Sequence, residues 1–334
     1  MNVEARIDAA LTRREVLPRK AGLEAVRLVN GAGDGLPGVH VDRFGPILLV
    51  STEEQIPFGP ILKRLLERCA PQALFRRTLA RNPRARRPAE LAPELVLAEV
   101  PSLASGEIVI REQGNSFLIR AREGGSPGLF LDQRDNRAHL AALVRERLAS
   151  DGSVLNTFAH TCSFSVAAAM AGARTTSVDL SARWLDWGRA NFAANGLDSA
   201  SHEFARGDAL TFLEIAAKKQ RSFDLVVLDP PTFSTSKQHG VFQVERHFGR
   251  LFELAARVAA PGAAVLCSHN QRTFTRAALA AKLRDGARAA RRRITKLDSF
   301  SPPPDFPGRD DVNPAARGFW VELDGAGGLR SPVS

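Results

Sequence analysis

The sequence predicts an α/β protein whose C-terminal part is a mostly parallel sheet covered by helices on both faces. From residue 153 onward, short aliphatic and β-branched runs alternate with stretches of helical periodicity. The run 223–228 is almost continuously apolar, as expected for a strand that is buried on both faces. Pro230 and Pro231 then end that strand abruptly, because proline cannot donate a hydrogen bond to a β-ladder.

The composition is that of an ordinary globular chain. Its 334 residues, 44% hydrophobic and 25% charged, suffice for two domains with separate cores. We find no apolar run of membrane-spanning length and no signal-peptide core, and we therefore expect a cytoplasmic protein. The three cysteines (Cys69, Cys162 and Cys267) are far apart, which argues against a disulfide framework or a metal site. The net charge of +10 would attract a polyanion such as RNA.

The N-terminal part is expected to be a small α+β domain over residues 1–123. The glycines within 31–38 do not form a P-loop, because no Gly-Lys-Ser/Thr follows them. The arginine-rich run Arg76–Arg87 is interpreted as a surface loop that could track phosphates. Helices are expected over 3–17 and 59–69, and strands over 25–30, 39–45, 46–51, 107–111 and 116–121.

The glycine-rich stretch 124–128 is the predicted boundary, so the second domain would span 124–334. Its expected helices are 133–149, 163–171, 182–195, 209–218, 242–259 and 274–290. Its expected parallel strands are 153–158, 175–179, 203–206, 223–228 and 263–268. A closing antiparallel pair, 294–300 and 317–323, would make the sheet seven-stranded.

Acidic residues follow three successive strands of this predicted sheet: Asp179, Asp208 and Asp229. The carboxyl ends of parallel strands meet at the edge where open α/β sheets bind ligands. A carboxylate there suits a ribose diol, and a second one suits an exocyclic amine, which predicts a nucleoside cofactor. The first turn of the sheet, 157–164, contains no glycine, which argues against a dinucleotide. S-adenosylmethionine (SAM) has no pyrophosphate and tolerates such a loop.

Five sequence motifs together resemble the SAM-dependent large-subunit ribosomal RNA methyltransferases of the I and K types, over about residues 5–323. The motifs are Gly35-Leu36-Pro37-Gly38, Asp42-Arg43-Phe44-Gly45, Phe130-Leu131-Asp132-Gln133-Arg134-Asp135, the loop Asn156 to Ala168, and Asp229-Pro230-Pro231-Thr232-Phe233-Ser234. The resemblance implies a class I, Rossmann-like methyltransferase fold, with residues 1–123 as a lid or substrate-binding domain.

The resemblance also implies a set of site residues. Asp179 would hold the ribose, Asp208 the adenine amine, and Asp229 would face the acceptor. The implied cofactor-binding residues are Phe130, Gln133, Arg134, Asn156, Phe158, His160, Thr161, Ser163, Asp179, Leu180, Ser181, Asn195, Asp208, Ala209 and Asp229. The implied catalytic residues are Asp132, Asp229, Pro230, Pro231, Thr232 and His269. No metal is implied.

The sequence departs from this family pattern at three places. The type I members begin with a PUA RNA-binding domain, and nothing before residue 5 here could supply one. They also carry a nucleophilic cysteine after the fifth strand, where this chain has His269, and Cys267 is expected in the core. Methylation of cytosine carbon is therefore not expected, and the K-type chemistry on a guanine ring nitrogen fits better. His160 replaces a frequent Tyr, which loses a cation–π partner for the sulfonium.

Three hypotheses of function remain at this stage. The first is methyl transfer to a nucleobase nitrogen in ribosomal RNA, with Arg76–Arg87 and Arg288–Lys296 as RNA contacts. The second follows the azetidine-2-carboxylate synthases, which resemble these enzymes and cyclise SAM itself with release of methylthioadenosine. Asp132, Asp135, Asn136 and Asp229 would then hold the amine. The third is a non-catalytic binding module. The sequence does not decide between a monomer and a homodimer.

Overall fold

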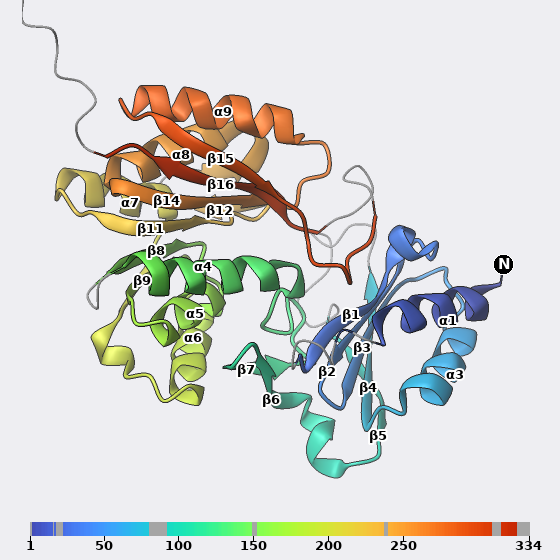
Figure 1. Ribbon diagram of the computed structural model, residues 1–334. Coiled ribbons are helices and arrows are strands. Elements are labelled where there is room, and N and C mark those ends of the chain that lie inside the picture. The colour runs from blue at the N-terminus through green and yellow to red at the C-terminus, as the bar shows by residue number, and fades with distance from the viewer. Residues whose placement is uncertain are drawn as a thin grey trace, which may run out of the picture. The chain divides into compact units, whose positions relative to one another are not determined.

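A computed structural model of the chain describes residues 2–15, 17, 23–79, 92–148, 152–236, 240–308 and 315–325 (Figure 1). The chain separates into two compact units, Met1–Arg134 with Pro303–Asn313, and Asp135–Pro302 with Pro314–Ser334. The division falls at the first residue of helix α4 (Arg134–Arg147), later than the glycine-rich stretch 124–128. The role of the first unit as a lid or substrate-binding domain stays a prediction. None of the helices in the described ranges is long and apolar enough to cross a bilayer.

The first unit is built on a five-stranded sheet in the order β1-β2-β3-β4-β5. Its strands are β1 (Ala25–Asn30), β2 (Val39–Phe44), β3 (Ile47–Glu53), β4 (Ala73–Leu79) and β5 (Glu94–Ala98). Helices α1 (Val3–Arg14) and α3 (Phe58–Cys69) bury Ile7, Ile61 and Leu65 in one cluster with strand residues such as Val26 and Val50. A separate hairpin consists of β6 (Glu107–Glu112) and β7 (Asn115–Arg120).

Strand β4 corrects the interpretation of the arginine-rich run as a loop. Arg76 and Arg77 lie in this strand, which pairs in parallel with β3 along its whole length. The Arg76 guanidinium lies 4.5 Å from the centre of the Phe58 ring, so its charge rests on an aromatic face. The rest of the run (Arg81, Arg84, Arg86 and Arg87) lies outside the described residues. Strand β5 was also not expected from the sequence.

A buried ion pair joins the two parts of the first unit that are distant in sequence. Asp305, fully buried, accepts hydrogen bonds from the two terminal nitrogens of Arg134 at 2.6 and 3.2 Å. It also accepts one from the backbone N–H of Arg27 at 2.9 Å. Arg14 donates to the carbonyl oxygen of Asp305 at 2.9 Å. The segment 303–308, which leaves the second unit between its last two strands, is thus part of the core of the first unit.

The second unit contains a seven-stranded sheet in the order β10-β9-β8-β11-β14-β16-β15. Strand β16 is antiparallel to both of its neighbours, β14 and β15, and the other strand pairs of this sheet are parallel. The strands are β8 (Ser153–Thr157), β9 (Arg174–Asp179), β10 (Glu203–Arg206), β11 (Phe223–Leu228), β14 (Ala259–His269), β15 (Ile294–Phe300) and β16 (Arg317–Leu323). This topology confirms the predicted α/β class I methyltransferase fold.

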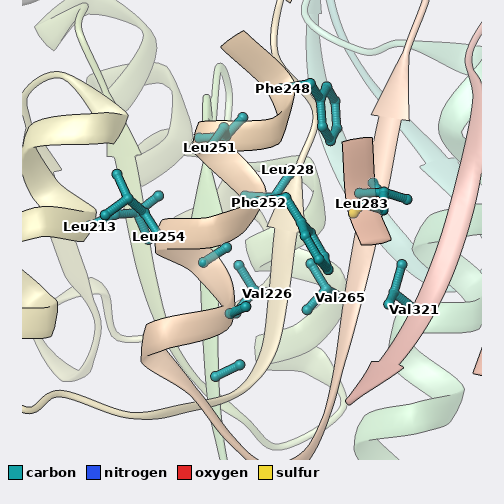
Figure 2. Packing of buried hydrophobic residues seen from close by; sticks show 14 of the residues in the cluster. Leu213, Val226, Leu228, Phe248, Leu251, Phe252, Leu254, Val265, Leu283 and Val321 are labelled. Atoms are coloured by element: carbon teal, nitrogen blue, oxygen red, sulfur yellow. The ribbon is translucent and has the colours of Figure 1, made fainter. Parts of the chain in front are cut away.

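Helices cover both faces of this sheet because its strands are apolar on both sides. On one face, Phe248, Leu251 and Phe252 of α8 and Leu283 of α9 pack on Val226 and Leu228 of β11 (Figure 2). On the other face, Leu225 and Val227 of the same strand pack under α4 and α5. The helices are α5 (Ser163–Met170), α6 (Ala182–Ala194), α7 (Ala209–Lys218), α8 (Val244–Val258) and α9 (Arg276–Ala289).

A short hairpin precedes α8, where the sequence was expected to be loop and helix. It consists of β12 (Phe233–Ser236) and β13 (Gly240–Gln243), paired antiparallel. The Phe242 ring is buried and lies 5.6 Å from the ring of Phe158 in the turn after β8. Helix α8 therefore begins at Val244 rather than at residue 242, because Phe242 is committed to this contact.

Candidate functional site at the carboxyl edge of the sheet

The register of the parallel strands aligns the residues that were predicted to form the site. Leu228 at the end of β11 is paired with Thr157 of β8 and with Cys267 of β14. In the same way, Thr157 is paired with Val178, and Asp179 with Arg206 of β10. The residues that directly follow these strands therefore lie next to one another along one edge. The topology reverses between β8 and β11, and such a point is where open α/β sheets bind ligands.

Asp179, the last residue of β9, connects two segments of this edge. One carboxylate oxygen accepts the backbone N–H of His160 at 2.8 Å, and the other accepts that of Ser181 at 2.9 Å. Burial raises the pKa of Asp179, and the two backbone hydrogen bonds oppose this rise by stabilising the charged form. Asp179 thus fixes the loop after β8 against the start of α6, where Ser181 is the N-cap.

The loop after β8 has an unusual backbone for a segment without glycine. Phe158, His160 and Cys162 have φ angles of 54°, 49° and 61°, all in the left-handed region. Non-glycine residues rarely adopt this region, and such conformations gather at ligand-binding sites where the surroundings enforce them. Here the backbone bond from His160 to Asp179 supplies part of that enforcement. The absence of glycine was visible in the sequence, but the left-handed backbone was not.

His160 occupies this loop as an uncharged aromatic ring. Its centroid lies 4.4 Å from that of the Trp184 ring on α6. Burial lowers the pKa of His160 to about 4, so the imidazole is neutral near pH 7. The next residue, Thr161, is buried, and its carbonyl oxygen accepts a hydrogen bond from Asn191 at 2.9 Å.

Asn156 points into the protein interior beneath the loop. Its side-chain amide donates to the hydroxyl of Ser165 at 2.9 Å, and that hydroxyl lies 2.8 Å from the Ser177 hydroxyl. All three side chains are buried, so they form a polar connection between β8, α5 and β9. Ser163 is the first residue of α5. Asn156 therefore supports the loop from below in this structure.

Of the predicted site residues that follow β9 and β10, some lie at the carboxyl edge of the sheet and one does not. Asp208 caps α7 by accepting the backbone N–H of Thr211 at 3.0 Å, and Ala209 is the first residue of that helix. Leu180 is partly exposed between Asp179 and the α6 cap. By contrast, Asn195 is the C-cap of α6, at the opposite end of the helix from Ser181. The carboxyl edge of the sheet therefore does not include Asn195.

The turn Asp229-Pro230-Pro231-Thr232 continues β11 beyond the sheet. Pro230 is buried and Pro231 is exposed. The Thr232 hydroxyl donates to the side-chain oxygen of Asn270 at 2.9 Å, which ties this turn to the segment that follows β14. Two prolines and this bond hold Asp229 in a stiff turn at the centre of the edge.

His269 and Cys267, near the end of β14, are both buried. Cys267 is 0% exposed within the main core cluster, as the sequence predicted, and burial raises the pKa of its thiol. His269 is 1% exposed, with its ring centroid 4.7 Å from that of Phe274. Burial lowers the pKa of His269 to about 4, and the charges of Arg317 and Arg276 act in the same direction.

We expect His269 to make the second unit sensitive to acid. Its pKa is 6.5 ordinarily and about 4 in the fold, so between these values only the unfolded chain takes up the proton. The unfolding free energy is therefore not reduced by His269 above about pH 6.5, and it decreases as the pH falls toward 4. His269→Phe should lose less unfolding free energy than the wild type between pH 7.5 and pH 4.5. Urea denaturation followed by tryptophan fluorescence checks this, and equal losses in both proteins would refute it.

Four predicted site residues belong to the first unit. Phe130 is 49% exposed, and it precedes the 3-10 helix Leu131–Gln133, in which Gln133 is buried and Asp132 is half-buried. Arg134 was expected to bind the cofactor. In the structure its guanidinium is buried and bound to Asp305. Asp305 is a residue that the sequence did not single out.

The seven-stranded sheet is typical of class I methyltransferases, and the comparison with known proteins specifies the family. Residues 62–320 match the S-adenosylmethionine-dependent methyltransferase family, and the chain belongs to that family. The enzyme is therefore a methyltransferase that depends on SAM. The fold, the family and the cofactor predicted from the sequence are thereby confirmed.

Several proteins of similar sequence are large-subunit rRNA methyltransferases. The ribosomal RNA large subunit methyltransferase I of Klebsiella pneumoniae subsp. pneumoniae is 32% identical over 308 residues, 91% of this chain and 74% of the relative. A ribosomal RNA large subunit methyltransferase of Deinococcus radiodurans is 35% identical over 298 residues, 85% of this chain and 71% of the relative. The crystal structure of SMU.776 complexed with SAH has a TM-score of 0.81 at 25% identity, covering 96% of this chain and 80% of that one.

Proposed function

We propose that this enzyme transfers the methyl group of SAM to a ring nitrogen of a nucleobase in RNA, without a covalent bond between enzyme and base. The observation that carries this proposal is the position of Cys267. Carbon methylation of cytosine in this family depends on a thiolate beyond the fifth strand, and here that strand ends at His269. Cys267 is fully buried with a raised pKa, so it cannot present a thiolate to a base.

In the proposed site, SAM lies along the carboxyl edge of the sheet and supplies an electrophilic methyl carbon on its sulfonium. Asp179 would accept the ribose hydroxyls with the lone pairs that the two backbone N–H groups leave. Asp208 would accept from the adenine amine. The loop 158–163 would enclose the methionine part, with neutral His160 beside the sulfonium. Arg134 would act indirectly: its guanidinium is bound to Asp305, and this bond would hold the neighbouring predicted site residues in position.

The chemistry asked of the protein is modest. A ring nitrogen with a free lone pair attacks the methyl carbon directly, so the protein must mainly align the two. Asp229 in its proline-stiffened turn would hold the acceptor base by accepting a hydrogen bond from an N–H of that base. Thr232, tied to Asn270, would keep this turn in place. No acid or base with a pKa near 7 is required for the transfer itself.

The RNA substrate is proposed from the relatives and from charge. The relatives named above are ribosomal RNA methyltransferases, and the net charge of +10 favours a polyanion. An rRNA substrate would place the enzyme in the cytoplasm.

We expect Cys267→Ala to keep methyltransferase activity. The substitution removes one buried sulfur atom and should cost roughly 1 kcal/mol of stability, similar to the loss of one core methyl group. The matched control is Cys69→Ala, which removes a thiol at the end of α3, away from the residues proposed to hold SAM. The measurement is transfer of radiolabelled methyl from SAM to large-subunit rRNA. A Cys267→Ala protein that is folded, binds SAM and is inactive would revive the covalent mechanism.

A second candidate is that the enzyme cyclises SAM and binds no RNA. It is favoured by one observation, namely that several basic residues expected to contact RNA are paired within the chain. Arg288 pairs with Asp285, Lys296 with Asp298, and Arg292 with Asp324. The Arg292 pair is largely buried and removes one cation that the sequence offered to RNA, whereas the other two pairs are exposed and can exchange.

Product analysis separates the two candidates. The purified protein is incubated with SAM alone and with SAM plus in-vitro-transcribed large-subunit rRNA. The methyltransferase proposal predicts S-adenosylhomocysteine, formed only when RNA is present. Methylthioadenosine together with a cyclic amino acid in the reaction without RNA would overturn it in favour of the second candidate.

A further inference from the structure

A basic cleft lies within the second unit, lined by residues from the second half of α9 and from the first half of β15 and the segment before it. Figure 1 shows α9 and β15 next to each other in this unit. The volume of the cleft is about 590 Å³, and it is lined by Arg284 and Arg288 from the helix and by Arg293 and Lys296 from the following segment. Arg284 and Arg288 are one helical turn apart and therefore share a face of α9. The segment 284–298 contains six Lys or Arg and two Asp, a net charge of +4 out of the chain's +10. Much of the excess positive charge is thus concentrated beside this cleft.

One of the lining arginines is structural. The guanidinium of Arg292 donates to the backbone carbonyl oxygens of Ala256, Ala259 and Ala260, at 3.1, 2.7 and 3.1 Å. It also donates to the carboxylate and the carbonyl oxygen of Asp324. With its donors used in this way, Arg292 holds the corner between α9 and β15 rather than offering its charge to a ligand. This bonding gives the cleft a defined floor.

Two other arginines are available. Within the described ranges of the chain, the side chains of Arg284 and Arg293 make no hydrogen bond or ion pair, and both residues are exposed. Arg288 and Lys296 pair only with exposed aspartates on their own elements, and such pairs contribute little and exchange readily. The cleft therefore presents two guanidinium groups without a hydrogen-bonded partner in the described part of the chain, and two cations that can change partner. The charge of Arg293 also acts on Asp324.

The composition of the cleft indicates what it binds. Guanidinium groups match phosphate geometry with paired N–H donors, and four cations contributed by a helix and a strand suit an extended chain of phosphates. A charged lysine on β15 also protects this edge strand against pairing with other chains. That protection requires neither a cleft nor arginines on the facing helix, so it does not account for Arg284 and Arg288.

We propose that this cleft is a docking site for the sugar–phosphate backbone of the RNA substrate, separate from the residues that hold SAM. The inference rests on the proposed RNA substrate and adds the surface that holds it. The contacts are to phosphates, so they contribute affinity and register without reading the base sequence. Of the expected basic residues, Arg288, Arg293 and Lys296 belong to this surface. Arg284, which the sequence did not single out, joins them, and Arg292 supports them.

The test is RNA binding by the double variant Arg284→Glu/Arg293→Glu across a range of KCl concentrations. The control is Lys218→Glu/Lys219→Glu, which changes the net charge equally on exposed residues at the end of α7. The probe is in-vitro-transcribed large-subunit rRNA. Loss of two phosphate contacts should lower the slope of log affinity against log salt by roughly 1.5 and weaken binding at least about tenfold. SAM affinity and the rate at saturating RNA should not change.

The outcomes separate this inference from the proposed chemistry. Equal weakening in the two double variants would mean that only overall charge matters, and it would overturn the docking site. If the wild type methylates RNA and Arg284→Glu/Arg293→Glu binds RNA as tightly as the wild type does, the docking site is also overturned. The proposed function would stand in that case. If the wild type binds RNA through the cleft but never methylates it, the docking site stands and the proposed reaction fails.

Discussion

Asp305→Ala is expected to loosen the first unit by several kcal/mol. The variant removes a carboxylate that binds the buried Arg134 guanidinium, and breaking a buried ion pair in this way costs about 3–5 kcal/mol. All three tryptophans (Trp184, Trp187 and Trp320) lie in the second unit, so their fluorescence does not report on this change. Native-state hydrogen exchange of the β1–β3 amides does, and we expect their opening free energy to fall by that amount.

Two further variants make this prediction specific. Arg134→Met/Asp305→Leu removes both charges and keeps similar volumes, and it should recover most of the lost stability. Asp285→Ala breaks an exposed pair with Arg288 and should leave the β1–β3 amides unchanged. Slow exchange in Asp305→Ala, equal to that of the wild type, would show that the pair does not hold the segment 303–308 in place.

Asp179→Ala is expected to weaken SAM binding by about 1.5–3 kcal/mol, which corresponds to roughly a ten- to 150-fold rise in Kd. In the proposed site the carboxylate holds the ribose. It also fixes the loop after β8 through the backbone of His160, so both contributions are lost together. Isothermal titration calorimetry with SAM measures the change.

The matched control is Asp186→Ala, which removes an exposed carboxylate from α6, the helix that follows Asp179 in the chain. It should bind SAM with the affinity of the wild type. Asp179→Asn keeps one acceptor oxygen and should fall between the two. If Asp179→Ala binds SAM as tightly as Asp186→Ala does, the ribose assignment is wrong and the cofactor does not lie along this edge as proposed.

The second unit could be predicted closely because its local signals agree with its packing. Strands 203–206, 223–228, 294–300 and 317–323 have the expected bounds. Helices α6 and α7 begin at the expected residues, and the side chains of Ser181 and Asp208 accept backbone N–H groups there. The apolar runs reveal strands that are buried on both faces, and the order of such strands follows from the alternation with helices.

The elements that were missed depend on contacts that no local pattern reveals. Arg76 and Arg77 suggested a solvated loop, but they lie in β4 because Arg76 packs on Phe58. The hairpin β12–β13 has little alternation of its own, and it is held by the contact between Phe242 and Phe158. In both cases the deciding partner is distant in sequence.

The same distinction holds for the candidate site. The acids at the strand ends could be predicted, because parallel register brings such positions together. The engagement of Asp179 with backbone amides, the left-handed loop and the pairing of Arg134 could not. Asp305 is 171 residues away from Arg134, inside a proline-rich stretch that resembles a simple connection.

The discontinuity of the first unit has a consequence for how the protein is made. Segment 303–308 supplies Asp305 and also the carbonyl of Pro307, which accepts from Asn30 and lies where a side chain at Gly33 would collide. During translation the nascent first unit therefore cannot finish folding when residue 134 emerges from the ribosome. It must wait for the contacts of segment 303–308 until almost the whole chain has been synthesised.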